Sequence, residues 1–226
     1  MNEEEIYKMI NTLELHELKN YFIVPANQYD VSTDDRLLIP IMRYQKYGFV
    51  DKEAMTIIEP KYDIINGDFY TCHDLVKVGI RYSVGFPKYN GEIKTYERYK
   101  WGVINAKGET LIEPLYYDIV VTDDRSPIVV RKFSEGYGVL NIHGNIIVPV
   151  GSYHYMDGFT NGYARVCKND KWGIINEKGE VVLPLEYDSV WKFYGKPELQ
   201  STKVVKDNKI DYFVFNTGRL KCQNNQ

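Results

Sequence analysis

Several features that mark common classes of protein are missing from this sequence. The 226 residues include only three cysteines, Cys72, Cys167 and Cys222, and no two of them have the spacing of metal ligands. Free thiols in a reducing compartment fit this pattern. No apolar run approaches the ~20 residues that span a bilayer. The Glu-rich residues 1–5 lack the basic start of a secretory signal. We therefore expect a cytoplasmic protein that does not bind membranes.

The charge balance and the lack of catalytic motifs exclude further classes. Lys and Arg number 28 against 31 Asp and Glu, so the net charge is −3. A protein that neutralises many phosphates normally carries a basic excess, so nucleic acid is excluded as the main partner. The sequence contains no P-loop, GxGxxG or HExxH motif. These absences predict a protein that is not an enzyme and uses no cofactor or metal.

Three short polar clusters resemble ligand sets but are interpreted as loop residues. Residues 72–74 (Cys-His-Asp) have no second half elsewhere at the spacing of metal ligands. The acidic pairs at 34–35 and 123–124 fall just before predicted strands, where Asp is a common turn residue.

What the chain does contain is a repeat. Five prolines are each followed within two to four residues by a tyrosine, and successive prolines are 35, 54, 35 and 35 residues apart. These prolines are Pro25, Pro60, Pro114, Pro149 and Pro184. A fixed period of this size predicts a repeat architecture.

The clearest repeat unit spans residues 163–190 and predicts three strands, at 163–167, 171–176 and 180–184. An Asn-x-x-Gly turn joins the last two strands and recurs in two other units. This pattern is typical of a turn closed by a left-handed residue, so we expect positive φ at Gly108, Gly144 and Gly179. Residues 51–54 lack the glycine, and we expect a different turn there.

The middle strand of each unit begins with an aromatic residue followed by glycine. The pairs are Tyr47-Gly48, Trp101-Gly102, Tyr137-Gly138 and Trp172-Gly173. Alternation along a strand places the ring and the glycine on opposite faces. We interpret the ring as core, so that Trp101 and Trp172 are largely buried. We interpret the glycine as room for the close approach of a neighbouring unit.

These residues resemble the WG (KWG) repeat of bacterial proteins. The resemblance covers roughly residues 21–220 and is best at 99–120 and 163–190. Tyr47 and Tyr137 replace the tryptophan in two units, and residues 209–212 have lost the motif. The resemblance implies an all-β repeat protein with a role in interaction and no enzyme activity.

We therefore predict about five three-stranded antiparallel β units of ~35 residues within 21–226. The units are expected at about 21–31 (partial), 37–65, 74–120, 127–157, 163–190 and 203–222 (degenerate). Their arrangement is an open curved stack or a closed, propeller-like ring. The degraded last motif favours the open stack, because it suits a cap. An apolar stripe predicts a short N-terminal helix over 1–20, which caps the first unit or binds a partner.

One gap in the repeat is 19 residues longer than the others, and the extra residues fall at 79–98. Alternating apolar residues flank Asn90-Gly91, the strongest short signal for a β-hairpin. Nine residues per arm predict an extended hairpin that projects roughly 30 Å.

This hairpin is rich in aromatic and basic residues, which are enriched at interface hot spots. The candidate partner-binding residues are Arg81, Tyr82, Phe86, Lys88, Tyr89, Lys94, Tyr96 and Arg98. The hairpin binds another protein, packs on its own repeats or forms a homodimer contact. The leading interpretation is a non-catalytic protein–protein interaction module, for instance an inhibitor, immunity-type or adaptor protein. The alternatives are a small-ligand or glycan-binding module that uses tyrosine rings and a structural subunit of a homo-oligomer.

Overall fold

A computed structural model of the chain describes residues 22–23, 38–51, 53, 55–66, 75–122, 125–194 and 201–222. These residues form β-strands and turns without any helix, which confirms the all-β prediction. No helix in the described ranges is therefore long and apolar enough to cross a membrane. The helix predicted over 1–20 and the polar clusters at 34–35, 72–74 and 123–124 lie outside the described residues.

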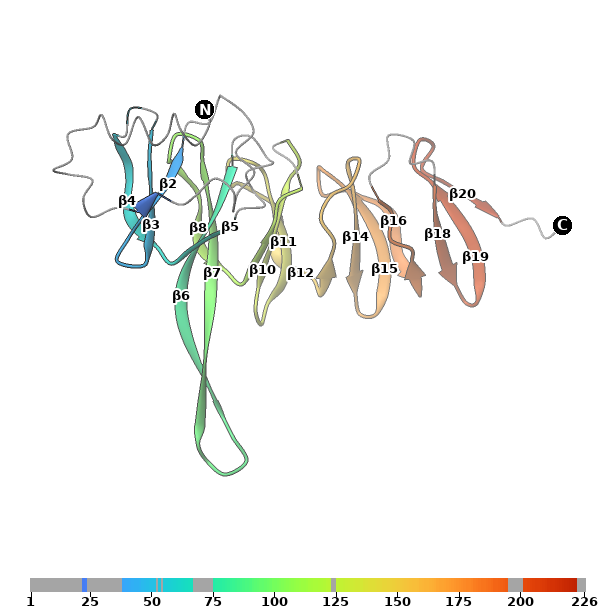
Figure 1. Ribbon diagram of the computed structural model, residues 1–226. Helices are drawn as coiled ribbons and strands as arrows, with labels where there is room; N and C mark the ends of the chain where they lie inside the picture. The colour runs from blue at the N-terminus through green and yellow to red at the C-terminus, as the bar shows by residue number, and fades with distance from the viewer. Residues whose placement is uncertain are drawn as a thin grey trace. The chain divides into compact units, whose positions relative to one another are not determined.

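The chain divides into two compact parts, the N-terminal half (residues 1–116) and the C-terminal half (residues 117–226). Each half is built from small antiparallel sheets of four strands, two in the first half and three in the second (Figure 1). Neighbouring strands in each sheet are consecutive in the sequence.

The N-terminal half contains sheets 1 and 2. Sheet 1 comprises β1 (Phe22–Ile23), β2 (Ile39–Arg43), β3 (Lys46–Val50) and β4 (Thr56–Tyr62). Sheet 2 comprises β5 (Ile64–Asn66), β6 (Leu75–Pro87), β7 (Ile93–Asn105) and β8 (Thr110–Tyr116).

The C-terminal half contains sheets 3, 4 and 5. Sheet 3 comprises β9 (Asp118–Val120), β10 (Ile128–Lys132), β11 (Gly136–Leu140) and β12 (Ile146–Tyr153). Sheet 4 comprises β13 (Tyr155–Met156), β14 (Tyr163–Lys168), β15 (Lys171–Asn176) and β16 (Val181–Tyr187). Sheet 5 comprises β17 (Ser189–Val190), β18 (Ser201–Lys206), β19 (Lys209–Val214) and β20 (Arg219–Cys222).

The repeat unit therefore has four strands where the sequence predicted three. The additional strand is only two or three residues long and follows the turn after the long last strand of the preceding sheet. Ser189–Val190, for example, follows Asp188 and pairs with β18. Phe22–Ile23 takes the same place in sheet 1, pairing with β2, and is not the last strand of a partial unit as predicted. The open stack and the closed ring both remain predictions.

Apolar side chains hold adjacent sheets face to face. One buried cluster joins sheets 1 and 2, a second joins sheets 3 and 4, and a third joins sheets 4 and 5. Ile174 and Ile175 point to opposite faces of β15, both are fully buried, and each belongs to a different cluster. Full burial of such a side chain is worth about 1.5–3 kcal/mol. The paired aliphatics after each aromatic-Gly motif thus give the middle strand two buried faces.

The glycine of the aromatic-Gly motif accommodates the next strand of its own sheet. A Cβ on Gly102 would lie 2.4 Å from the carbonyl oxygen of Ile112, and a Cβ on Gly173 would lie 2.6 Å from that of Leu183. The pairing register shifts at this position in both sheets, which marks a β-bulge. The prediction of close approach is confirmed, but its source is not a neighbouring unit.

The two tryptophans predicted to be largely buried are both partly buried in the structure. Trp172 packs against the buried cluster that joins sheets 4 and 5. Lys77 lies over the ring of Trp101 at 4.5 Å, and Arg165 lies over the ring of Trp172 at 5.0 Å. A cation therefore covers the part of each ring that the core does not.

The Asn-x-x-Gly turns have the predicted geometry. Gly108, Gly144 and Gly179 have φ of 82°, 80° and 80°. The Asn105 side-chain oxygen accepts hydrogen bonds from the amides of Lys107 at 3.0 Å and Glu109 at 2.9 Å.

The corresponding turn of sheet 1 keeps this hydrogen-bonding frame without the glycine. The Asp51 carboxylate accepts from the amides of Glu53 at 3.0 Å and Met55 at 2.7 Å. A different turn was expected there, but Asp51 replaces the asparagine as the acceptor. Residue 54 itself lies outside the described residues.

Candidate interaction surface

The predicted hairpin is present and is formed by the two longest strands among the described residues. β6 and β7 pair without interruption from Leu75–Asn105 to Pro87–Ile93. β5 pairs with β6 only as far as Gly79, and β8 pairs with β7 only from Trp101. Residues 80–87 and 93–100 therefore extend as a two-stranded ribbon beyond sheet 2 (Figure 1). We call residues 80–100 the finger; eight residues per arm give it a length of about 26 Å.

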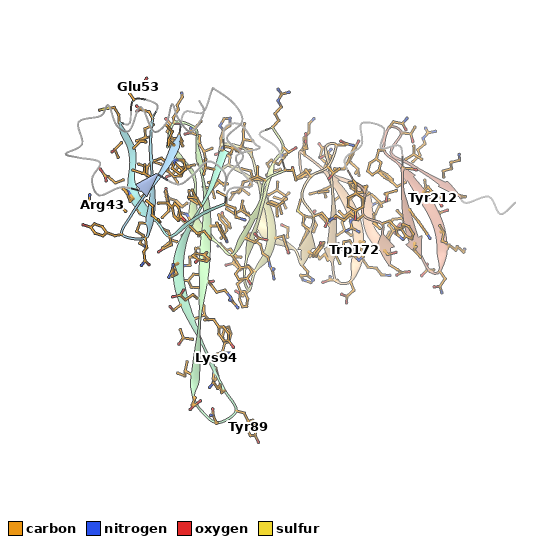
Figure 2. The ribbon with its side chains drawn as sticks, in the orientation of Figure 1. Arg43, Glu53, Tyr89, Lys94, Trp172 and Tyr212 are labelled. Carbon is orange, nitrogen blue, oxygen red and sulfur yellow. The ribbon has the colours of Figure 1, made fainter. Side chains whose placement is uncertain are left out.

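The tip of the finger is a tight turn at the predicted position. The Lys88 amide donates to the Glu92 carbonyl at 2.6 Å, and the Gly91 amide donates to the Lys88 carbonyl at 3.0 Å. Gly91 has φ of 82°, which glycine adopts without steric cost. The Lys88 ammonium lies 2.8 Å from the Glu92 carboxylate and lowers its pKa. Tyr89 is exposed and points away from the ribbon at the tip (Figure 2).

The strand register divides the finger into two chemically different faces. In an antiparallel pair, residues directly opposite each other lie on the same face. Tyr82 opposes Arg98, Val84 opposes Tyr96, and Phe86 opposes Lys94. These six residues, with the opposed pair Ile80 and Lys100, form what we call the cationic face.

The side chains of the cationic face contact one another. Lys94 and Arg98 lie over the Tyr96 ring at 4.8 and 5.6 Å, and Lys100 lies over the Tyr82 ring at 5.5 Å. The Phe86 ring meets the Tyr96 ring edge-on, with centroids 5.8 Å apart. Three cations and no carboxylate are found among the eight residues of this face. The contact with a ring restricts the rotamers of each cation in the free protein. Less conformational entropy is therefore lost when a partner binds.

The opposite face of the finger is electrically balanced. Arg81 lies 3.3 Å from Glu97 and 4.0 Å from Asp63. The Arg81 amide also donates to the Asp63 carboxylate at 2.8 Å. Burial raises the pKa of Asp63, but the hydrogen bond from the Arg81 amide and the nearby Lys46 outweigh it, so the pKa is lowered. Arg81 thus anchors the base of the finger.

The structure brings together five of the eight candidate residues. Tyr82, Phe86, Lys94, Tyr96 and Arg98 share the cationic face, whereas Arg81 is on the other face and Lys88 and Tyr89 are in the tip turn. Lys100 completes the face and was not predicted. The alternation of residues 94, 96, 98 and 100 along one strand was the signal that could have found it.

The C-terminal half contains two other candidate sites, a cavity and an ion-pair network. A cavity of about 480 Å³ is lined by Val148, Ser152, Tyr153, Lys168, Asn169, Lys171 and Leu185. One of its two lysines, Lys171, already pairs with Asp188 at 2.6 Å. The described residues contain no group of three His, Cys, Asp or Glu side chains placed to hold a metal ion.

The second feature is a half-buried ion pair in sheet 4. Arg165 lies 2.6 Å from Asp157 and donates to the Val190 carbonyl of sheet 5 at 2.5 Å. The Tyr155 hydroxyl donates to Asp157 at 2.8 Å, and this hydrogen bond raises the pKa of the tyrosine. Each charged group in this network has a protein partner, so the network serves to join two sheets.

Comparison with known proteins gives one family. A sequence profile described as "WG containing repeat" matches residues 47–72, 101–124, 137–172 and 172–196. Two of the matched stretches begin at Tyr47 and Tyr137, where tyrosine replaces the tryptophan. A comparison with curated proteins gives no match.

Similar solved structures are distant. They include a crystal structure of the eukaryotic initiation factor (13% identity, TM-score 0.44, 84% of this chain and 52% of that chain). They also include the dihydro-heme d1 dehydrogenase NirN in complex with DHE (11% identity, TM-score 0.33, 84% and 55%) and the AfRom2 CNH domain (11% identity, TM-score 0.25, 84% and 67%). The chain spans about half the length of the first two, and at these TM-scores the likenesses carry no argument.

The family assignment agrees with the structure unit by unit. Each of the four matched stretches begins at the aromatic-Gly pair in the third strand of sheets 1, 2, 3 and 4 and continues through the fourth strand into the next sheet. Sheet 5 keeps the same four-stranded form although its motif is lost. The chain belongs to the WG-repeat family.

Proposed function

We propose that this WG-repeat protein is a non-catalytic binding protein that holds another protein through its finger. The observation that carries the proposal is the cationic face, on a ribbon that extends beyond its sheet. A two-stranded ribbon is marginally stable in water by itself. Its sixteen strand residues contribute none of the fully buried side chains of the N-terminal half. An insertion of this kind is more readily explained by recognition than by stability.

Protein is the partner class that the finger's chemistry favours. Tyrosine and arginine are enriched among hot-spot residues because they bury a large rigid area while keeping a polar group for pairing. Tyr82, Tyr96 and Arg98 provide this combination on one face. The part-buried positions of both tyrosines hold them in place before binding.

The proposed setting is the cytoplasm, and the proposed role is that of an inhibitor, immunity-type or adaptor protein. The buried Cys167 and the exposed Cys222 are both free thiols, which suits a reducing compartment. No acid, base and nucleophile set accompanies the cationic face, so the proposed action is binding alone.

The test compares the intact chain with a variant in which residues 83–97 are replaced by Asn-Gly. Tyr82 and Arg98 oppose each other, so a two-residue turn can join them. Both proteins are immobilised and exposed to lysate of the source cells, and captured proteins are quantified by mass spectrometry. The proposal expects a stoichiometric protein that the intact chain captures and the shortened variant does not. Equal capture by both proteins would refute a role for the finger.

Two controls separate the remaining roles. One control compares two double variants. Lys94→Glu/Arg98→Glu changes two cations of the finger, and Lys107→Glu/Lys178→Glu makes the same charge change at exposed turns outside it. The second variant should leave capture unchanged. Light scattering of the intact chain tests the homodimer: loss of a dimer on shortening the finger would assign it to self-association.

A second candidate function, small-ligand or glycan binding, is favoured by the cavity in the C-terminal half. Its volume falls within the range of ligand pockets. Thermal stabilisation of the intact and shortened proteins by the same sugar or nucleotide would favour this function over the first.

A further inference from the structure

Among the described residues the outer edge of β7 has no strand partner along the finger, and of its outward groups the Glu97 carbonyl accepts a hydrogen bond from the Arg98 guanidinium at 3.3 Å. No strand among the described residues pairs with residues 93–100 on that side, because β8 joins β7 only from Trp101. An exposed strand edge presents a row of backbone donors and acceptors that another chain can pair with. Addition of a partner strand to such an edge is a common mode of peptide recognition.

The register shows which amides of β7 face this edge. The Arg81 amide donates to Asp63, away from β7, so Arg81 and Tyr99 form a pair without mutual hydrogen bonds. Such pairs alternate with hydrogen-bonded pairs along an antiparallel ladder. The amides of Tyr99, Glu97 and Thr95 therefore point to the free edge of β7.

The two edges of the finger are not equivalent. On β6, the first outward amide, that of Arg81, is already held by Asp63. All three cations of the cationic face, Lys94, Arg98 and Lys100, come from β7. A strand added beside β7 would place alternate side chains next to these cations and next to Tyr96.

The charge of the finger selects an acidic partner. Residues 80–100 contain five Lys or Arg and two Glu, a net charge of +3, whereas the whole chain has a net charge of −3. A second finger would bring like charges together at this edge, which is destabilising. Nucleic acid would need open ring faces for stacking, but a cation covers each tyrosine ring of the face.

Building on the proposed function of the finger, we infer that the partner contributes an extended acidic strand that pairs with the free edge of β7. Carboxylates at alternate positions of this strand lie on the cationic face, beside Lys94, Arg98 and Lys100. Backbone hydrogen bonds to Thr95, Glu97 and Tyr99 hold the strand in register. Charge-assisted pairing through the side chains and backbone pairing along the edge thus hold the same strand.

The test uses a synthetic peptide of five Glu-Val repeats as the probe and the full chain labelled with ¹⁵N. Binding should shift the amide signals of residues 93–100 and slow hydrogen exchange at Thr95, Glu97 and Tyr99. A peptide of five Lys-Val repeats should bind at least tenfold more weakly. No binding of the Glu-Val peptide at millimolar concentration would overturn the inference, as would tighter binding of a single-stranded oligonucleotide.

Two variants separate the backbone from the charges. Thr95→Pro removes one outward amide and no charge, and proline is tolerated where the N–H faces solvent. We expect it to weaken binding of the Glu-Val peptide at least tenfold, while Thr95→Ala stays within threefold of the intact chain. Lys94→Glu/Arg98→Glu, which keeps every backbone amide, should also weaken binding at least tenfold. Unchanged affinity in Thr95→Pro or in the double charge variant would overturn the inference.

The same variants distinguish this inference from the function on which it rests. If the cellular partner is lost on shortening the finger but retained in full by Thr95→Pro and by the charge variant, the finger binds a protein by another mode and the inference is refuted. If shortening the finger does not affect capture, the proposed function itself fails.

Discussion

The Lys46 ammonium donates to the Asp63 carboxylate at 2.5 Å and so joins the start of β3 to the turn after β4. The other Asp63 oxygen accepts from the Arg81 amide in the next sheet. The relationship recurs in the C-terminal half, where Asp188 accepts from Lys171 at 2.6 Å and from the Asp207 amide at 2.8 Å. The aspartate that follows the last strand of a sheet therefore links that sheet to its successor.

The first prediction concerns the acid stability of this link. The pKa of Asp63 is lowered in the folded chain, so its carboxylate stabilises the fold at pH values above the unfolded pKa of about 3.9. This contribution should be lost as the pH falls through the lower, folded pKa. Asp63→Asn should therefore lower the free energy of unfolding at pH 7 and leave it nearly unchanged at the acidic end. Urea unfolding at a series of pH values measures this, and an equal loss at pH 7 and at pH 2 would contradict it.

The second prediction ranks two residues of the same strand. Trp172 is half-buried beneath Arg165, whereas Ile174 is fully buried between sheets 4 and 5. Ile174→Ala should cost about 2–5 kcal/mol. Trp172→Ala should cost less, about 1–2 kcal/mol, because it loses a cation–π contact and part of its buried area. Denaturant midpoints of both variants give the order. A larger loss of unfolding free energy for Trp172→Ala than for Ile174→Ala would contradict the prediction.

The third prediction tests the bulge at the aromatic-Gly motif. A Cβ on Gly102 would collide with the backbone of β8, so Gly102→Ala should cost about 1–3 kcal/mol through forced backbone movement. Gly91→Ala is the control, because no other atom lies within 4 Å of its Cβ position and only its positive φ opposes the change. That variant should cost no more than about 1 kcal/mol. Equal thermal melts for the intact chain and Gly102→Ala would contradict the assignment.

The fourth prediction separates the finger from the core. Replacing residues 83–97 by Asn-Gly removes no fully buried side chain. The melting temperature should therefore change little, and the far-ultraviolet spectrum should lose only the contribution of the ribbon. A shortened variant that unfolds would show that the finger supports sheet 2.

Local turn chemistry could be predicted from the sequence, whereas short strands and strand register could not. The Asn-x-x-Gly turns and the Asn90-Gly91 tip depend on local backbone chemistry, and both were predicted at the residues where they occur. Short strands such as Ser189–Val190 were missed because two residues carry no periodicity. The cation over Trp172 was missed because Arg165 comes from the neighbouring strand, and the alternation along β15 does not show it. The separation of Arg81 from the cationic face needed the register of β6 against β7, which composition cannot provide.

The most direct test of the account is hydrogen exchange of the intact chain with and without its captured partner. The account predicts that the partner slows exchange in the finger, with the largest effect at the outward amides of β7, and leaves the exchange of the buried strands β10 and β15 unchanged. Slowed exchange in the C-terminal half with none in residues 80–100 would contradict it.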